Sequence, residues 1–183
     1  MLYSHLDHLP ELTVPEPYGI RSEGPGDDKA WERIITESFK ETFLYRMMTE
    51  DKAYRPERVF FVTDGKNIPV ATAASWVTSD YPPDCAVLHM VGALTEHSGH
   101  RLGFYVSLAA MKQARKEGFS RMVLRTDDFR IPAIKTYIRL GFVPCIVHEN
   151  HIGRWKEILK KIKREDLAAL LPHFYDGTTT HDI

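Results

Sequence analysis

Residues 88 to 142 read LHMVGALTEHSGHRLGFYVSLAAMKQARKEGFSRMVLRTDDFRIPAIKTYIRLGF, and the rest of the fold is predicted outward from them. The stretch begins in an apolar run over residues 87 to 94, which is typical of a buried strand. A small, polar loop with glycines follows over residues 95 to 103, and apolar residues at helical spacing continue from 104 to 117. The pattern predicts a strand, a loop and a helix that starts where the loop ends.

The loop at residues 95 to 103 is a candidate anion site. The first N–H groups of a helix have no partner within the helix, and the positive end of the helix dipole lies beside them. A phosphate group satisfies both, so the loop predicts a cradle for a pyrophosphate. The alternative is a turn that only redirects the chain, because a single glycine loop is a weak signal.

The second half of the stretch predicts a strand over residues 121 to 125, a polar turn and a short helix that Gly141 closes. With these elements the stretch resembles the GNAT superfamily of acyl-CoA-dependent N-acyltransferases. The family's loop pattern is Gln/Arg-x-x-Gly-x-Gly/Ala, and its later pattern is Asn-x-x-Ala-x-x-x-Tyr-x-x-x-Gly-Phe. Here the two patterns read SGHRLG at residues 98 to 103 and RIPAIKTYIRLGF at residues 130 to 142.

Matches and departures both fall at defined positions of these patterns. The matching residues are Gly103, Ala133, Tyr137, Gly141 and Phe142. The departures are Ser98 in place of Gln or Arg, Arg101 in place of glycine and Arg130 in place of asparagine. If the loop requires φ > 0 at Arg101, a non-glycine residue is strained there, although Gly99 could absorb part of the turn. The Arg101 guanidinium is either a direct phosphate contact or a solvated side chain.

The resemblance covers residues 18 to 147 and implies an α/β (α+β) fold. We expect a mixed, mostly antiparallel sheet with helices on both faces and a V-shaped splay between the strands that flank the CoA loop. Residues 1 to 17 are expected to form an N-terminal extension over the surface, and residues 148 to 183 a C-terminal helix and tail packed on the domain. The other predicted elements are a strand (18 to 22), two helices (29 to 39 and 41 to 48), a hairpin (58 to 63 and 69 to 77) and a last strand (143 to 147).

An apolar stripe that begins at Trp155 predicts a helix docked on the body or on a second subunit, so a homodimer is one of two options. The polar tail from residue 176 to 183 is expected to be loose.

Composition narrows the class of protein. A chain of 183 residues with 43% hydrophobic residues can form one domain with a proper core. A net charge of −1 does not favour a nucleic-acid partner. Cys85 and Cys145 suggest neither a disulfide framework nor a zinc site, and His148 with His151 lacks a third metal ligand. No run is long enough to span a membrane and the start is unlike a signal peptide, so we expect a cytoplasmic protein that uses no metal.

The resemblance assigns acetyl-CoA as the cosubstrate and also the residues that bind it. The pantetheine arm of CoA is expected to pair with the backbone of Val91, Gly92 and Ala93, where Gly92 permits close approach. Backbone N–H groups near His89 or Met90 are expected to face the thioester carbonyl. The full set of predicted binding residues is Val91, Gly92, Ala93, Ser98, Gly99, His100, Arg101, Leu102, Gly103, Phe104 and Arg130.

Acyl transfer to an amine also needs a base and a proton donor. Tyr137 occupies the family's tyrosine position, where the phenol is thought to protonate the departing thiolate; a tyrosine that only packs against the sheet is the alternative. Cys85, Val87 and His89 share one strand face, and only His89 among them is a credible base near neutral pH. A structural histidine is the other interpretation, with Asp84, His148 or a water chain as competing bases.

The sequence predicts an N-acetyltransferase that moves the acetyl group of acetyl-CoA to a primary amine by direct attack in a ternary complex. One alternative is a CoA-binding or ligand-sensing module without catalysis, and another is a protein lysine or N-terminal acetyltransferase. Phe43, Tyr45, Arg46 and Met47 either line the acceptor pocket or fill the core. Residues 127 to 130 and 148 to 155 look similar to parts of acetyltransferases described as mycothiol-synthase-like, which does not establish the acceptor.

Overall fold

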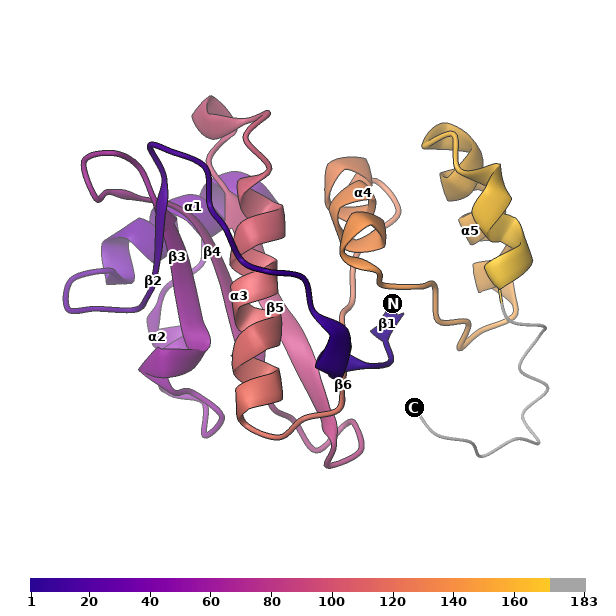
Figure 1. The fold of residues 1–183 in the computed structure, drawn as a ribbon, viewed down its shortest axis with the longest axis horizontal. Coiled ribbons are helices and arrows are strands. Elements are labelled where there is room, and N and C mark those ends of the chain that lie inside the picture. The colour runs from indigo at the N-terminus through magenta and orange to yellow at the C-terminus, as the bar shows by residue number, and fades with distance from the viewer. Residues whose placement is uncertain (172–183) are drawn as a thin grey trace.

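The computed structural model describes residues 1 to 171 as a six-stranded sheet with helices on both faces (Figure 1). The strand order is β1-β6-β5-β4-β3-β2, and every neighbouring pair is antiparallel except β5 and β6, which are parallel. The strands are β1 (Leu2–Tyr3), β2 (Gly19–Ser22), β3 (Val59–Thr63), β4 (Pro69–Trp76), β5 (Cys85–Ala93) and β6 (Arg121–Val123). The predicted mixed, mostly antiparallel sheet is therefore confirmed.

Helices cover the two faces of this sheet. The helices are α1 (Asp28–Phe39), α2 (Arg46–Thr49), α3 (Leu102–Lys116), α4 (Ile131–Leu140) and α5 (Asn150–Lys161). In the view of Figure 1, α3 crosses in front of the sheet, α1 lies behind it, and α4 stands between α3 and α5. The side chains that α3 turns toward β3, β4 and β5 are small or aliphatic and fully buried, as in Val106, Leu108 and Ala110. Burial of this apolar stripe is what fixes α3 on the sheet.

The sheet splits between β5 and β6. The two strands pair only at Cys85, Ala86 and Val87, after which β5 continues for six more residues and β6 ends. The register between β4 and β5 shifts where Thr72 pairs with Gly92 but Ala74 pairs with His89. Met90, in this interval of β5, has a positive φ of 49°. An extra residue of this kind is a β-bulge, which bends the strand and disrupts the ladder. The bulge lies at the start of the V-shaped splay that the resemblance implied.

Two predictions about the edge of the sheet are wrong. The first residues of the chain do not simply wrap the surface, because Leu2 and Tyr3 form β1 against β6 and Leu6 is fully buried. The last strand predicted over residues 143 to 147 does not form, and only Val143 makes a bridge, to Leu2. The two errors are related, since β1 occupies the edge of β6 that a last strand would need. Pro144 also has no N–H to donate to a ladder.

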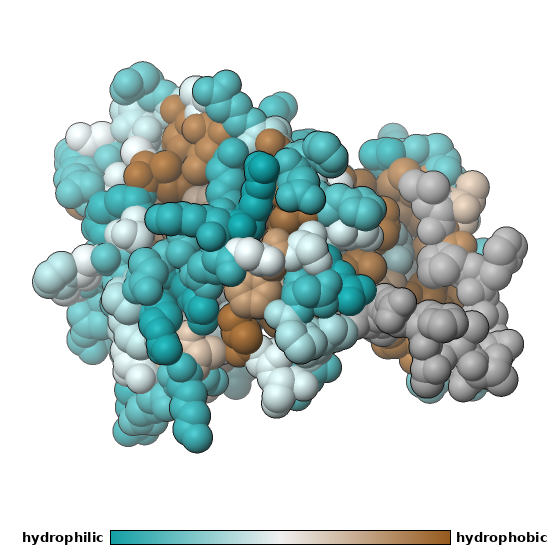
Figure 2. Space-filling view, turned by 60° about the horizontal axis from the view of Figure 1, so that its bottom comes forward, coloured by the Kyte–Doolittle hydropathy of each residue, from teal (hydrophilic) through white to brown (hydrophobic). Residues whose placement is uncertain are grey.

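The C-terminal part packs beside α4. Helix α5 begins at Asn150, earlier than the apolar stripe predicted, and buries Trp155, Ile158 and Leu159 against Ile134 of α4. The helix therefore docks on the body, one of the two predicted options. On the face drawn in Figure 2, hydrophilic residues cover most of the surface, and hydrophobic atoms are exposed where the body meets this part. The predicted loose tail at residues 176 to 183 lies outside the described residues.

Other boundaries also shifted. The helix predicted over residues 41 to 48 is the single turn of α2, which starts only at Arg46. The predicted domain boundaries at residues 17 and 147 stay predictions. None of the helices described up to residue 171 has both the length and the apolar character that a membrane span requires.

Candidate active site

A cavity of about 630 Å³ runs along the splay and joins the loop before α3 to the start of α4. Its walls come from four places: the end of α1, the end of β5, the loop with the first turn of α3, and α4. Ten of the predicted site residues line it: Val91, Gly92, Ala93, Ser98, Gly99, Arg101, Leu102, Gly103, Arg130 and Tyr137. His100, Phe104 and His89 are not among the lining residues.

The loop that leads into α3 leaves a group of backbone donors open. A short 3-10 helix, η3 (Thr95–His97), ends at Ser98, and Gly99 then turns the chain with a φ of +90°. Within the described part of the chain, the N–H groups of residues 99 to 103 donate no hydrogen bond, and no side chain caps α3. Five unpaired donors at the positive end of a fifteen-residue helix form a strong site for an anion such as a pyrophosphate.

Arg101 has a positive φ, the backbone conformation that is strained for a residue other than glycine. Its φ of 58° and ψ of 28° are left-handed, in the position where the family pattern has glycine. Such a conformation costs a non-glycine residue on the order of 1 kcal/mol. The side chain is exposed and pairs with no acidic residue of residues 1 to 171, so its charge is free to face an anion in the cavity.

Gly103 and Gly92 line the same cavity, but a side chain at these two positions would meet different surroundings. A Cβ atom on Gly103 would meet no atom within 4 Å, so a larger side chain would extend into open space at the loop. A Cβ on Gly92 would lie 2.8 Å from Ser38 Oγ and 3.1 Å from Ile34 and Ile35 of α1. The close approach that Gly92 permits in this structure is that of α1, and pairing of the pantetheine arm with Gly92 stays a prediction.

Ser38 also occupies backbone groups of β5 that would otherwise be open to a ligand in the splay. Leu94 N–H donates to Val70 O at 2.9 Å, so by alternation Gly92 faces β4, whereas Val91 and Ala93 face the splay. The Ala93 N–H donates to Ser38 Oγ at 3.0 Å, and the Ser38 hydroxyl lies 3.3 Å from the Ala93 carbonyl oxygen. Of the three residues predicted to pair with pantetheine, Val91 is the one whose backbone faces the splay without a side-chain partner in the described chain.

Tyr137 reaches the cavity from α4 and is nearly enclosed. The side chain is 6% exposed and packs against Phe142 with ring centroids 6.1 Å apart. Burial raises the pKa of Tyr137 to about 12, and the positive charge of Arg130 opposes this rise. The phenol is protonated at neutral pH, as an ordinary tyrosine is, and its O–H can donate a hydrogen bond into the cavity.

His89 lies on the sheet face that carries α1. It stands opposite Ala74 in the ladder, and its ring lies 5.2 Å from that of Trp76, which shares this face. Burial lowers the pKa of His89 below its usual value, and the charge of Asp51 opposes this effect. A neutral imidazole can accept a proton near pH 7. The structure thus places His89 on β5 beside Trp76 and Tyr137 on α4, and of the two only Tyr137 lines the cavity.

The two competing bases, like His89, lie outside the cavity lining. Asp84 lies before β5, where Arg121 Nε donates to its carboxylate at 3.0 Å, and this hydrogen bond lowers the pKa of Asp84. His148 is exposed ahead of α5, and its Nδ1 accepts from the Asn150 N–H. Neither residue lines the cavity.

Arg130 spans the cavity instead of leaving its guanidinium free. Its Nε donates to Asp127 at 3.0 Å, and its guanidinium carbon lies 4.1 Å from the ring centroid of Phe39. Its Nη1 approaches the Ser38 carbonyl oxygen at 3.4 Å. Arg130 therefore ties the start of α4 to the end of α1 by a cation–π contact and hydrogen bonds.

The end of α1 is the part of the site that the sequence analysis missed. Four consecutive residues of this region line the cavity: Glu37, Ser38, Phe39 and Lys40. Glu37 also accepts a hydrogen bond from the Thr95 N–H at 2.7 Å, which lowers the pKa of the Glu37 carboxyl. The one available signal was Gly92, because a glycine inside a strand often marks the close approach of another segment.

Comparisons with known proteins agree with this geometry. A model of the acetyltransferase (GNAT) family matches residues 29–142, more than half of the chain. The chain is 28% identical over 150 residues to a mycothiol acetyltransferase of Nocardia farcinica, covering 76% of this chain and 50% of that protein. A mycothiol acetyltransferase of Pseudarthrobacter chlorophenolicus is 30% identical over 146 residues, covering 73% and 45%. The chain spans about half the length of these curated relatives.

Solved structures show the same fold at lower identity. The ribosomal-protein-S18-alanine N-acetyltransferase of Escherichia coli superposes with a TM-score of 0.59 at 19% identity, over 73% of this chain and 82% of that one. A GCN5-related N-acetyltransferase from Sphaerobacter thermophilus gives a TM-score of 0.59 at 19% identity, over 76% of this chain and 46% of that one. The chain belongs to the GNAT family of acetyltransferases, whose members use acetyl-CoA.

Proposed function

We propose that this chain is an N-acetyltransferase that transfers the acetyl group of acetyl-CoA directly to a primary amine in a ternary complex. The observation that carries the proposal is the cavity itself, which connects the unpaired N–H groups of residue 99 and residues 101 to 103 with the protonated phenol of Tyr137. Phosphate oxygens need donors of the first kind, and a departing thiolate needs a donor of the second.

The chemistry requires a C–N bond to form and a C–S bond to break. The amine nitrogen attacks the acetyl carbonyl carbon, and the proton that the amine loses passes to neutral His89, directly or through water. Collapse of the addition species releases the thiolate, which takes the proton of Tyr137. The lowered pKa of His89 leaves its imidazole neutral at pH 7, and the phenol of Tyr137 is protonated there, so each group starts in the protonation state that its step needs.

A CoA-binding module without catalysis is the second candidate. Arg101 and Arg130 favour it, because both depart from the family pattern inside the cavity. The presence of Tyr137 in the cavity, at the position where the family pattern has its tyrosine, supports catalysis instead. The acceptor is left open between a small amine, as the similarity to mycothiol acetyltransferases suggests, and a lysine or N-terminal amine of a protein.

The test is a calorimetric titration with acetyl-CoA, CoA and pantetheine, followed by CoA-thiol release with a panel of small amines and peptides. We expect acetyl-CoA and CoA to bind with similar affinity and pantetheine to bind at least about tenfold more weakly, because it lacks the pyrophosphate. Binding without thiol release from any amine would favour the sensing module. Equal binding of pantetheine and CoA would contradict the phosphate cradle.

A further inference from the structure

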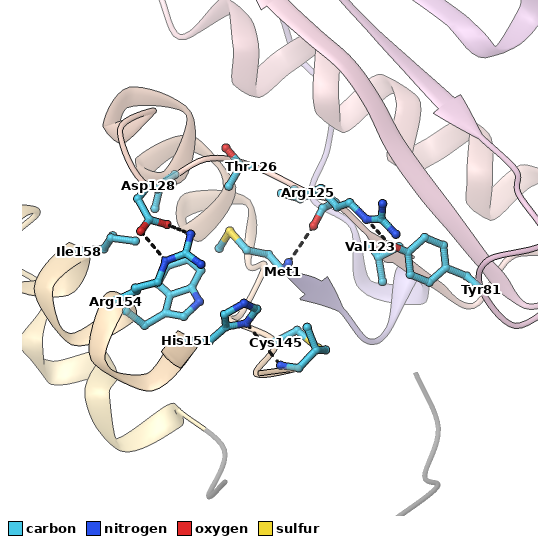
Figure 3. Close-up of a pocket in the computed structure, with 14 residues that line it drawn as sticks. Met1, Tyr81, Val123, Arg125, Thr126, Asp128, Cys145, His151, Arg154 and Ile158 are labelled. Carbon is cyan, nitrogen blue, oxygen red and sulfur yellow. Dashed lines mark hydrogen bonds and ion pairs between the residues drawn. The ribbon is translucent and has the colours of Figure 1, made fainter. Parts of the chain in front are cut away.

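A second cavity, of about 320 Å³, lies between β6, the segment that follows it and α5 (Figure 3). Its lining residues include Arg125, Asp128, His151, Arg154, Trp155 and Ile158. None of them lines the larger cavity, so the two are separate spaces. Its volume is in the range of pockets that take small organic molecules.

The apolar part of this lining is continuous with the second hydrophobic cluster. Trp155 and Ile158 of α5 and Ile134 of α4 are buried there, and Val123 of β6 is 4% exposed. These side chains present a wall for an apolar or aromatic body, whose burial contributes about 25 cal/mol per Å².

The charged part of the lining has an excess of positive charge. Arg154 donates from Nε and Nη2 to Asp128 at 2.7 and 2.8 Å, and its Nη1 has no partner within residues 1 to 171 (Figure 3). Arg125 donates to the Tyr81 hydroxyl at 3.0 Å and forms no ion pair in the described chain. Two arginines thus face one aspartate, and that aspartate is already paired.

His151 adds a further polar group to the lining. The Nδ1 of His151 accepts weakly from the Val147 N–H at 3.5 Å, which leaves Nε2 as the donor nitrogen.

We propose that this second cavity binds a small organic anion, a single carboxylate on an apolar or aromatic body. The carboxylate is placed among Arg154, His151 and Arg125, where positive charge exceeds negative charge, and the body is placed against Trp155 and Ile158. Guanidinium groups bind carboxylates with directed, charge-assisted hydrogen bonds, which gives the site its preference for this chemistry.

The segment between the cavities links their occupancy. Asp128 pairs with Arg154 in the second cavity, whereas its neighbour Asp127 pairs with Arg130 in the first. A carboxylate that competes with Asp128 for Arg154 changes what holds residues 126 to 130, and these residues position Arg130 over Phe39. By thermodynamic linkage, acetyl-CoA and the anion then alter each other's affinity by the same factor.

The test uses 4-fluorophenylacetate as the probe and follows its fluorine resonance by NMR during titration with the full chain. The uncharged 4-fluorophenylacetamide is the matched control for the probe. We expect saturable binding of the carboxylate and binding of the amide at least about fivefold weaker, since the amide lacks the charge. Saturating CoA should leave the probe bound and shift its dissociation constant.

Two substitutions locate the probe. Arg154→Gln removes the cation and should weaken binding about fivefold or more, whereas Arg139→Gln, an exposed arginine of α4 outside both cavities, should not. Val147→Trp places a bulky side chain at the exposed rim and should block the probe without disturbing the core.

Several results would overturn the proposal. These are the absence of saturation, equal binding of the carboxylate and the amide, full displacement of the probe by CoA, or equal effects of Arg154→Gln and Arg139→Gln. A probe that binds as expected while acetyl-CoA affinity stays unchanged would overturn the linkage. None of these measurements depends on acetyl transfer, so they are independent of the proposed enzymatic activity.

Discussion

The two ends of the main cavity are built from different parts of the chain. At the loop end the ligand groups are backbone N–H donors of residues 99 to 103, and the side chains of Ser98, His100 and Arg101 are exposed. At the proposed reacting end the side chain of Tyr137 lines the cavity and that of His89 does not; burial raises the pKa of Tyr137 and lowers that of His89. A site made of backbone tolerates changes of residue type as long as the turn forms. A site made of side chains depends on particular atoms, so substitutions should affect the two ends differently.

The largest effect is expected at the reacting end, from Tyr137→Phe. Loss of the proton donor should lower kcat about 100-fold while the dissociation constant of acetyl-CoA stays within about twofold, since the phenol acts on the leaving group. Steady-state kinetics and calorimetry measure the two quantities. Tyr105→Phe is the control, because this tyrosine of α3 lines neither cavity. An unchanged kcat in Tyr137→Phe would exclude the phenol from the mechanism.

At the loop end, Gly103→Val should act on binding. The new side chain projects into the space before the loop donors, so we expect acetyl-CoA to bind at least about tenfold more weakly. Gly153→Val is a matched control, because it adds the same side chain to a helical glycine of α5 that also has no atom within 4 Å of its Cβ position. Equal affinities in the two folded variants would contradict the cradle.

His89 offers a test of the reacting end through pH. Its lowered pKa keeps the imidazole neutral at pH 7, so a base at this position loses activity only as pH falls through a value below 6.5. We expect the profile of kcat/KM to show this acid limb, and His89→Gln to abolish the limb and lower kcat/KM at pH 7.5 about tenfold or more. If kcat/KM of His89→Gln still falls at low pH in the same way, the group that titrates is the acceptor amine or another base.

The comparison also explains what could be predicted from the sequence. The loop, the helix after it and Tyr137 were found because local patterns carry them: apolar spacing, a glycine loop and a tyrosine in register with Ala133 and Gly141. The strain at Arg101 could also be predicted, because the cost of a positive φ depends on the type of that residue and not on distant contacts.

The missed features all come from contacts between distant residues. Ser38 bonds to Ala93 from 55 positions away, and no local pattern marks that pairing. Strand β1 has two residues, too few for a period of two to show, yet by taking the edge of β6 it displaces the strand predicted at residues 143 to 147. His89 was placed on the correct face with Val87, but whether that face lines the cavity depends on the bulge at Met90.

The smallest effect is expected from Arg101, where backbone and side chain can be separated. Arg101→Gly relieves the left-handed conformation and should raise the stability by about 1 kcal/mol, a rise in Tm of about 2 to 4 °C for a chain of this size. Arg101→Ala keeps the strain and should leave the Tm unchanged. Differential scanning calorimetry of the two variants therefore measures the stability cost of the left-handed backbone separately from the loss of the side chain. If the loop binds through its N–H groups alone, acetyl-CoA affinity stays within about twofold in both variants. A loss of about tenfold in both would instead make the guanidinium a phosphate ligand, and the loop end would then depend on a particular side chain as the reacting end does.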